Sequence, residues 1–307
     1  MIIFHTDLDN TLIYSYKHDI GADKRCVEVY NGREISFITQ NTYQLLQKIH
    51  SQENDKNQLI MVPTTTRTIE QYQRINLGVG DFQYALVCNG GVLLVDGKED
   101  EGWYRESLKL VQNSREQLEK ALELLDKEKR RTFELRFIKD LFVFTKCEEP
   151  EAVAEALRKV LKADVVDVFN NGVKVYVVPK TLNKGKAVER FKSYVGAGYV
   201  IAAGDSEFDI SMLEAADLGI AAPCLAQNYS FSDKVYSLQM KSAVSIAPAA
   251  CCKAANFHMR PCASLYTGRS VLSTASIQCP SVKKLYSETV LDTVLQISAD
   301  RHYIKDF

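Results

Sequence analysis

The chain has 307 residues, which is long for one compact core and comfortable for two domains. Its 46% hydrophobic and 25% charged residues and its formal net charge of -1 are ordinary for a globular protein, so we expect neither a nucleic-acid partner nor a membrane partner. No apolar run is long enough to cross a bilayer, the N-terminal stretch lacks the basic region of a signal peptide, and the eight cysteines show no CxxC spacing, so we expect a cytoplasmic protein with mostly free thiols.

The N-terminal part of the chain predicts alternating strands and helices. The expected elements are strands at residues 1–6, 59–63 and 84–88, a helix at 39–50, and a helical stretch that ends at Ile75. Strand, helix, strand, helix, strand is typical of a parallel sheet with helical crossovers. The turn sequence Asn89-Gly90-Gly91 stops the last of these strands.

Between about residues 90 and 180 the pattern changes to hairpins and two amphipathic helices. Strands are expected at 92–95 and 103–105 around an Asp96-Gly97 turn, at 133–138 and 141–146, and at 165–169 and 173–178, with helices at 114–127 and 150–161. The turn Asn170-Asn171-Gly172 between the last two strands is a strong hairpin signal. This region therefore predicts an α+β domain inserted into the parallel one.

The first pattern resumes after Asn183. Helices are expected at 184–194, 207–216 and 287–298, and strands at 199–203 and 218–221, whereas residues 242–281 are rich in Ala, Ser and Cys and predict no regular element. We therefore predict an α/β fold. Its Rossmann-like parallel core is discontinuous, at residues 1–89 and 181–307, and carries an inserted α+β cap domain at 90–180, with an atypical segment of unknown role at 242–281.

Two carboxylates follow the first predicted strand, in Asp7-Leu8-Asp9-Asn10-Thr11. Alternate residues of an extended chain face the same way, so a turn at the strand end can aim Asp7 and Asp9 at one small volume. One carboxylate can then attack phosphorus and bind a hard cation while the other handles the proton. A solvated acidic turn is the alternative reading of this short motif.

A second acidic group, Gly204-Asp205-Ser206-Glu207-Phe208-Asp209, follows another predicted strand and opens a helix. Because the carboxyl ends of parallel strands share one edge of a sheet, we expect Asp205 to lie beside Asp7. Converging carboxylates repel one another unless a cation lies among them, and this favours a Mg²⁺ site. A helix-capping box from Ser206 to Asp209 is the alternative, and it would account for Asp209 but not for Asp205.

Two further groups have the residue types that bind phosphate. The run Thr64-Thr65-Thr66-Arg67 follows the strand at 59–63, where hydroxyl and backbone N–H groups can hold phosphate oxygens, although a helix N-cap is the alternative. Lys184 lies at a helix start, where the helix dipole disfavours a cation unless an anion is nearby. A solvated lysine is the alternative for Lys184.

The order of these groups, DxDxT, threonine, lysine and GDxxxD, resembles the haloacid dehalogenase superfamily of phosphatases. The position of the inserted domain is similar to the Cof-like and sucrose-phosphate-phosphatase-like branch with its C2-type cap, and Asn89-Gly90-Gly91 looks like that branch's transition into the cap. The chain departs from the family pattern at three places. Asn10 and Thr66 stand where glycine is usual, and Ser206-Glu207-Phe208 stands where the branch commonly has GDGxND.

The resemblance implies a role for each catalytic group. Asp7 would be the nucleophile that forms an aspartyl-phosphate, and Asp9 would protonate the leaving oxygen and then activate water. Thr65, aligned with the threonine of the family's TGR motif, and Thr66 beside it would bind phosphate. Lys184 would neutralise the nucleophile and the phosphate oxygens, which is how in-line phosphoryl transfer gains most of its rate.

The resemblance also implies a Mg²⁺ cofactor. Asp7 and Asp205 would coordinate the ion, Asp209 would bind it directly or through water, and Asp9 would contribute its backbone carbonyl. These residues are the predicted metal site of the chain.

Substrate specificity is expected from the cap, which closes over the core in that family. Arg136, Lys174 and Tyr176, on predicted cap strands, are candidates to face a substrate, and plain solvent-facing strand residues are the alternative. By analogy the chain is predicted to be a Mg²⁺-dependent phosphatase for a small phosphorylated metabolite, a sugar phosphate. A phosphomutase and a binding or regulatory protein on the same fold are the competing hypotheses, and no pattern indicates an oligomeric state.

Overall fold

The computed structural model describes residues 1–54, 59–196, 198–237 and 280–299. The chain divides into two compact units, of which unit 1 comprises Met1–Met61, Arg74–Gly80 and Val195–Phe307 and unit 2 comprises Val62–Gln73 and Asp81–Tyr194. The predicted atypical segment lies outside the described residues except for its last two positions. This division does not test the predicted domain limits at residues 90 and 180, which stay a prediction.

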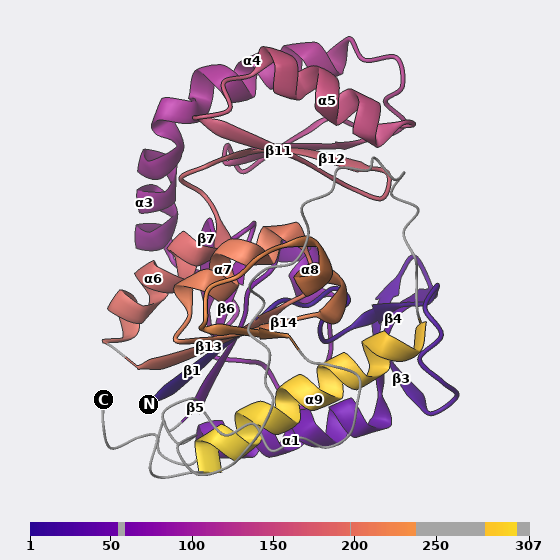
Figure 1. The fold of residues 1–307 in the computed structure, drawn as a ribbon, viewed down its shortest axis with the longest axis vertical. Helices are drawn as coiled ribbons and strands as arrows, with labels where there is room; N and C mark the ends of the chain where they lie inside the picture. The colour runs from indigo at the N-terminus through magenta and orange to yellow at the C-terminus, as the bar shows by residue number, and fades with distance from the viewer. Residues whose placement is uncertain (55–58, 197, 238–279, 300–307) are drawn as a thin grey trace. The chain divides into compact units, whose positions relative to one another are not determined.

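A parallel sheet forms the centre of unit 1, which confirms the predicted fold class (Figure 1). In spatial order its strands are β15 (Val235–Ser237), β14 (Leu218–Ala221), β13 (Tyr199–Gly204), β1 (Ile2–Thr6) and β5 (Leu59–Pro63). Every residue of β1 is buried, as expected of a strand covered on both faces. Because β1 pairs with β13 from Ile2 opposite Tyr199 to Thr6 opposite Ala203, the two strands end at the same edge of the sheet.

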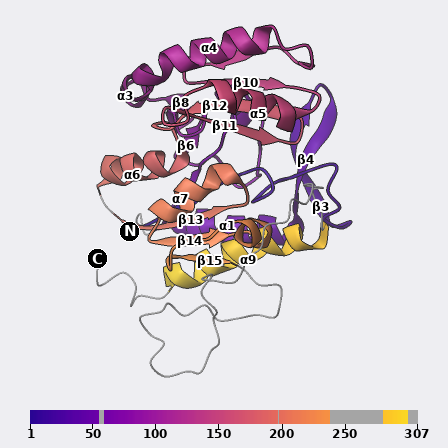
Figure 2. The ribbon, with the colours of Figure 1, turned by 45° about the horizontal axis from the view of Figure 1, so that its top comes forward.

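Two long helices of unit 1, far apart in the sequence, lie side by side. They are α1 (Gln40–Asn54) and α9 (Pro280–Ala299), purple and yellow in Figures 1 and 2. The helix predicted at 287–298 is confirmed, and its apolar stripe, Val290, Leu291, Val294 and Ile297, is buried. Shorter helices follow the strands β13 and β14: η2 (Glu207–Asp209), α7 (Ile210–Ala215) and α8 (Pro223–Asn228). Within the described ranges, no helix has both the length and the apolar character that a bilayer crossing requires.

A small antiparallel sheet in unit 1 was not predicted. It has the order β2 (Tyr14–Ser15), β4 (Arg33–Thr39) and β3 (Lys24–Tyr30), with register shifts on either side of Glu28. Glu28 is buried at 1% exposure. Its carboxylate accepts hydrogen bonds from Arg74 (Nε 3.2 Å, Nη2 3.1 Å) and from the Ser36 hydroxyl (2.7 Å). A buried carboxylate with these partners fixes residues 24–39 to the segment around Arg74.

In unit 2, a second antiparallel sheet joins β6 (Tyr84–Val87), β7 (Val92–Val95) and β8 (Lys98–Glu99), with the predicted turn at Asp96-Gly97. The predicted strand at residues 103–105 is wrong, because these residues lie in α3 (Glu101–Val111). The Asp100 carboxylate caps this helix by accepting from the Trp103 backbone N–H at 2.8 Å, which favours helix over strand at this point. The Trp103 indole donates to the Gly90 carbonyl at 3.0 Å, and the Arg190 guanidinium lies 3.9 Å from its ring centroid.

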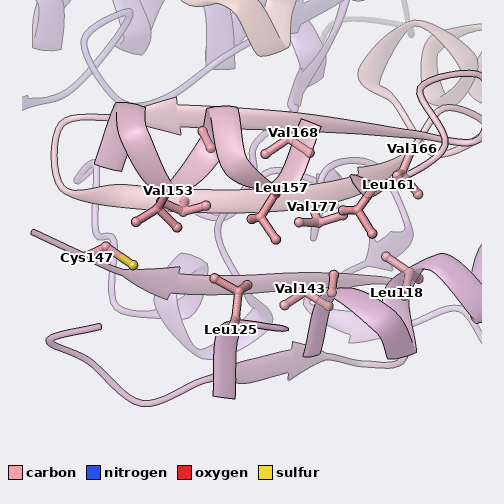
Figure 3. Close-up of a cluster of buried hydrophobic side chains, with 13 residues drawn as sticks. Leu118, Leu125, Val143, Cys147, Val153, Leu157, Leu161, Val166, Val168 and Val177 are labelled. Atoms are coloured by element: carbon pink, nitrogen blue, oxygen red, sulfur yellow. The ribbon is translucent and has the colours of Figure 1, made fainter. Parts of the chain in front are cut away.

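The two later hairpins and the two helices predicted for the inserted region are confirmed. An antiparallel sheet runs β11 (Val166–Asn171), β12 (Lys174–Pro179), β10 (Phe142–Lys146) and β9 (Arg136–Ile138), with α4 (Arg115–Asp126) and α5 (Pro150–Val160) packed on one face. Figure 3 shows the core between them, where Leu157 and Val153 of α5 and Leu118 of α4 meet strand valines such as Val143 and Val177. The other helices of unit 2 are α2 (Ile69–Gln73), η1 (Gln112–Ser114) and α6 (Lys184–Val195), whose last residue belongs to unit 1.

Candidate functional site

The carboxyl ends of β1 and β13 bring three carboxylates together in unit 1. Asp7 and Asp205 come directly after these strands, and the backbone N–H of Asp7 donates to the Ala203 carbonyl at 2.9 Å, which continues the pairing past the last strand residue. Asp7, Asp205 and Asp209 each offer one carboxylate oxygen, and these oxygens lie within 4.8 Å of one another. The neighbouring strand ends thus place Asp205 beside Asp7, although the two are far apart in the sequence.

These three aspartates are buried or half-buried. Asp7 is 6% exposed and Asp209 is fully buried, whereas Asp205 is half-buried. Burial lowers the pKa of His5, on β1, to about 3, so this imidazole stays neutral and adds no positive charge to the group. Three clustered carboxylate oxygens are the hard donors that Mg²⁺ prefers, and their mutual repulsion is relieved by a cation. The residues present therefore fit a Mg²⁺ ion.

The turn after Asp7 has a left-handed residue at Asn10, with φ 63°. The Leu8 carbonyl accepts the N–H groups of Leu12 and Ile13, both at 2.9 Å, and closes the turn. Asparagine tolerates this conformation better than most residues with a side chain, so it can stand at a position where the family resemblance leads one to expect glycine. Asp9 is half-buried on this turn, and its carboxylate is not one of the three in the group.

Asp209 also organises the loop on which it lies. Its Oδ2 accepts from the N–H of Asp205 (3.1 Å) and from the N–H and hydroxyl of Ser206 (2.9 and 2.8 Å), so the capping box considered from the sequence is present. A Cβ added at Gly204 would lie 2.3 Å from the Asp209 Cβ, so this close approach requires glycine. The Thr11 hydroxyl donates to Asp205 Oδ1 at 3.4 Å and connects the loop to the turn after β1.

The predicted phosphate-binding residues belong to unit 2, whereas the three carboxylates belong to unit 1. Thr65 is fully buried, its hydroxyl accepts the Arg67 N–H at 3.2 Å, and Thr66 beside it is half-buried. Lys184 begins α6 at 1% exposure, so the alternative of a solvated lysine is wrong. A buried ammonium group is stable only with hydrogen-bond acceptors or an anion around it.

Asn89 connects the two predicted phosphate-binding segments within unit 2. Its backbone N–H donates to the Thr65 carbonyl at 2.9 Å, and its side-chain Nδ2 donates to the Leu182 carbonyl, two residues before Lys184, at 3.0 Å. For this residue the sequence offered the turn signal of Asn89-Gly90-Gly91 and its resemblance to a transition into the cap. Its connecting role depends on segments about a hundred residues apart and could not be read from the motif.

The three predicted substrate residues lie on the sheet of β11, β12, β10 and β9, and they differ in exposure and contacts. Arg136 and Tyr176 both pair with Phe144, so they share the face opposite to the helices, and the Tyr176 ring packs against that of Phe144 with centroids 5.0 Å apart. Tyr176 is buried, Arg136 is half-buried and pairs with Glu134, and Lys174 is exposed at the start of β12. The exposure of Lys174 fits both readings, so its role as a substrate residue stays a prediction.

A cavity of about 300 Å³ lies beside Arg136 in unit 2. It is lined by Thr68, Ile69, Glu70, Arg136, Phe137, Ile138 and Lys139. The hydrogen bond from Thr68, together with its own backbone N–H and the nearby charges of Lys139 and Arg136, holds the pKa of the Glu70 carboxyl below its usual value. The cavity is thus lined by one ionised carboxylate and two cations, whereas the Phe137 ring packs on the helix-covered face of the sheet.

Comparison with known proteins agrees with this architecture. The sequence profile described as haloacid dehalogenase-like hydrolase matches residues 4–223, well over half of the chain, whereas no curated protein matches the sequence. Among solved structures, the sucrose-phosphatase from Synechocystis sp. PCC6803, in complex with sucrose and phosphate, has a similar fold with a TM-score of 0.52 at 18% identity, covering 78% of this chain and 91% of that one.

Two further solved structures are more distant. A haloacid dehalogenase-like hydrolase from B. subtilis matches with a TM-score of 0.43 at 16% identity, over 72% of this chain and 89% of that one. Trehalose-6-phosphate phosphatase from Aspergillus fumigatus matches with a TM-score of 0.41 at 13% identity, over 77% and 87%. The profile match decides the family, so the predicted superfamily and the prediction of a hydrolase are confirmed. The chain belongs to the haloacid dehalogenase-like hydrolase family.

Proposed function

We propose that the chain is a Mg²⁺-dependent phosphatase that hydrolyses a small phosphorylated metabolite through an aspartyl-phosphate on Asp7. The observation that carries this proposal is the group formed by Asp7, Asp205 and Asp209 at the edge of the parallel sheet. The repulsion between the buried Asp7 carboxylate and the two further carboxylates opposes folding unless a cation is bound. Family membership makes hydrolysis the expected chemistry of this group.

The carboxylates of Asp7, Asp205 and Asp209 and the backbone carbonyl of Asp9 would hold Mg²⁺. When bound, the ion would neutralise these carboxylates and the charge that develops on the phosphoryl oxygens. The hydrogen bonds that Asp209 Oδ2 accepts from Asp205 and Ser206 keep the loop in the conformation that presents both carboxylates.

The reaction would have two steps. In the first, an Asp7 oxygen forms a bond to phosphorus as the bond to the leaving oxygen breaks, and Asp9 gives that oxygen a proton. In the second, Asp9 takes a proton from water, the water oxygen bonds to phosphorus, and the bond to Asp7 breaks to release inorganic phosphate. Asp7 and Asp9 return to their starting states, so no further reactant is needed.

Thr65, Thr66 and Lys184 would bind the phosphate oxygens. The burial of Thr65 and Lys184 supports this role, since desolvated donors bind an anion more strongly than exposed ones. For the rest of the substrate we propose a sugar phosphate in the cytoplasm. Support comes from the 300 Å³ cavity beside Arg136, whose carboxylate and cations suit the hydroxyl groups of a sugar.

The proposal is tested by phosphate release from a panel of sugar phosphates and other phosphorylated metabolites with Mg²⁺ and with EDTA. We expect release that EDTA abolishes and that falls at least about a thousandfold in Asp7→Asn, because that variant loses the nucleophile. Asp233→Asn, an exposed aspartate of the same unit, is the matched control and should keep full activity. Full activity of Asp7→Asn would exclude the mechanism.

The competing hypotheses give different products. A phosphomutase would move phosphate between two positions of a sugar without releasing it, and would need a bisphosphate to start each cycle. Product analysis by ³¹P NMR distinguishes the two, because only hydrolysis gives inorganic phosphate in step with substrate loss. A binding or regulatory protein would bind a phosphorylated metabolite without changing it.

A further inference from the structure

Tyr286, on α9, reaches the end of the strand that carries the metal-binding loop. Its side chain is 3% exposed, and its hydroxyl accepts the backbone N–H of Gly204 at 3.0 Å. The same hydroxyl lies 2.8 Å from the carbonyl oxygens of Gly204 and Ile220, either of which can take its single proton. One side chain therefore joins the carboxyl ends of β13 and β14 at the residue that precedes Asp205.

There is little space between Gly204 and the loop that carries Asp209. Its backbone is in close contact with the Asp209 side chain, whose Cβ, Cγ and Oδ2 all lie within 3 Å of where a Cβ of residue 204 would be. Asp209 in turn accepts the N–H of Asp205 and of Ser206. The position of the Gly204 peptide is thus transmitted through direct contacts to both loop carboxylates. A tyrosine whose hydroxyl accepts the Gly204 N–H and lies against the Gly204 carbonyl fixes the residue before Asp205 and so controls where both carboxylates point.

The next residue of α9, Ser287, is connected through Tyr14 to the turn that carries Asp7 and Asp9. Ser287 is fully buried, exchanges a hydrogen bond with the Thr42 hydroxyl at 3.0 Å and hydrogen-bonds with Tyr14. The Tyr14 hydroxyl lies 3.4 Å from the Thr11 carbonyl, and Thr11 donates to Asp205. Consecutive residues of one helix are therefore connected to both carboxylate loops, Tyr286 through Gly204 and Ser287 through Tyr14.

We propose that Tyr286 is a positioning residue for the Mg²⁺ site, acting through Gly204 on Asp205 and Asp209. The proposal rests on the Mg²⁺ site of the proposed function and adds a part of the chain beyond residues 4–223, the stretch that matches the family profile. Burial, and then the charges of Asp205 and Asp209, raise the pKa of the Tyr286 hydroxyl well above its usual value, so it remains a neutral donor in any assay buffer.

The test measures Mg²⁺ binding by isothermal titration calorimetry on the full chain, alongside the thermal midpoint and the Mg²⁺ dependence of phosphate release. Tyr286→Phe keeps the ring and removes the hydroxyl. We expect its Kd for Mg²⁺ to rise about tenfold or more, the usual effect of losing a residue that orients metal ligands. Tyr14→Phe, which removes the second connection, should raise the Kd in the same direction by a smaller factor and keeps the proposal testable if Tyr286→Phe does not fold.

The matched control is Val294→Ala. This residue is fully buried on the same helix but lies two turns away, about 12 Å along the axis. It should lower the thermal midpoint while leaving the Kd for Mg²⁺ within about twofold of the unaltered chain, because it removes packing and no contact to Gly204. Asp205→Asn should lose Mg²⁺ binding and calibrates complete loss of the site.

The outcomes separate this proposal from the proposed function. A Tyr286→Phe chain that binds Mg²⁺ as tightly as the unaltered chain overturns the positioning role and leaves the phosphatase proposal intact. Equal weakening in Val294→Ala and Tyr286→Phe also overturns it, since helix packing alone would then suffice. If the unaltered chain binds no Mg²⁺, the metal of the proposed function is wrong and the role of Tyr286 falls with it.

Discussion

Replacement of Arg74 by alanine should leave the Glu28 carboxylate buried without its cation. The Glu28 side chain is 0% exposed and that of Arg74 is 31% exposed, with Arg74 Nη2 at 3.1 Å from Glu28 Oε1. Removing one partner of a buried ion pair lowers the free energy of unfolding by about 3–5 kcal/mol. Water reaches Arg74 and Ser36 still donates to the other carboxylate oxygen, so we take the lower end of that range, about 3 kcal/mol.

Part of this loss comes from the Arg74 guanidinium, which lies 4.7 Å from the centroid of the Tyr30 ring. Such a contact contributes about 0.5–1 kcal/mol at a partly exposed site. Arg25→Ala measures the size of a comparable arginine–ring contact, because the exposed Arg25 guanidinium lies 4.2 Å from the Tyr43 ring centroid. We expect Arg25→Ala to lose at most about 1 kcal/mol.

The assay is urea unfolding followed by circular dichroism at pH 7. The double variant Glu28→Gln with Arg74→Ala is included because an amide needs no counter-charge, and it should be more stable than Arg74→Ala alone by about 1–2 kcal/mol. Equal losses in Arg74→Ala and Arg25→Ala, or a double variant less stable than Arg74→Ala, would refute the reasoning that a buried charge dominates.

Two further predictions concern unit 2. Leu157→Ala in the cluster of Figure 3 should lower the free energy of unfolding by about 3 kcal/mol in urea unfolding, whereas Leu124→Ala, which is 37% exposed, should lose less than about 1 kcal/mol. Gly90→Ala should lower the thermal midpoint far more than Gly97→Ala. Both glycines have positive φ, but a Cβ at Gly90 would lie 2.3 Å from the Ala187 Cβ, whereas one at Gly97 meets no atom within 4 Å; equal shifts would contradict the steric reason.

The elements that were predicted correctly are those in which local pattern and tertiary environment agree. The continuous apolar runs of β1 and β13 indicate strands buried on both faces, and their pairing places Asp7 beside Asp205. Trp103 is the opposite case. Its aromatic neighbourhood favours a strand locally, while the hydrogen bond from its N–H to Asp100 starts a helix.

The sheet of β2, β3 and β4 escaped prediction for a related reason. The strand β3 is polar and exposed at both ends, and its buried centre includes the charged residue Glu28. A glutamate can be predicted to be buried in a strand only when its charged partner is known. For Glu28 that partner, Arg74, is 46 residues away. Local sequence carries no trace of this pairing.

Some residues of the candidate site could likewise be predicted from the sequence, and others could not. The order of motifs along the chain predicts the three clustered carboxylates, because parallel strands share one edge. Neither Asn89 nor Tyr286 has such a signal. The apolar stripe of α9 predicts a packed helix, but the bond from Tyr286 to Gly204 spans 82 residues and involves only backbone atoms of the partner, which have no residue identity to recognise.

Trp103 gives the chain a built-in optical reporter. It is the single tryptophan of the sequence, 6% exposed in unit 2, with its indole N–H on the Gly90 carbonyl and a guanidinium against its ring. Its fluorescence emission should therefore be blue-shifted and should respond to solvent only when the surroundings of α3 open. Emission follows unit 2 alone while circular dichroism follows both units, so a single unlabelled sample distinguishes sequential from concerted unfolding.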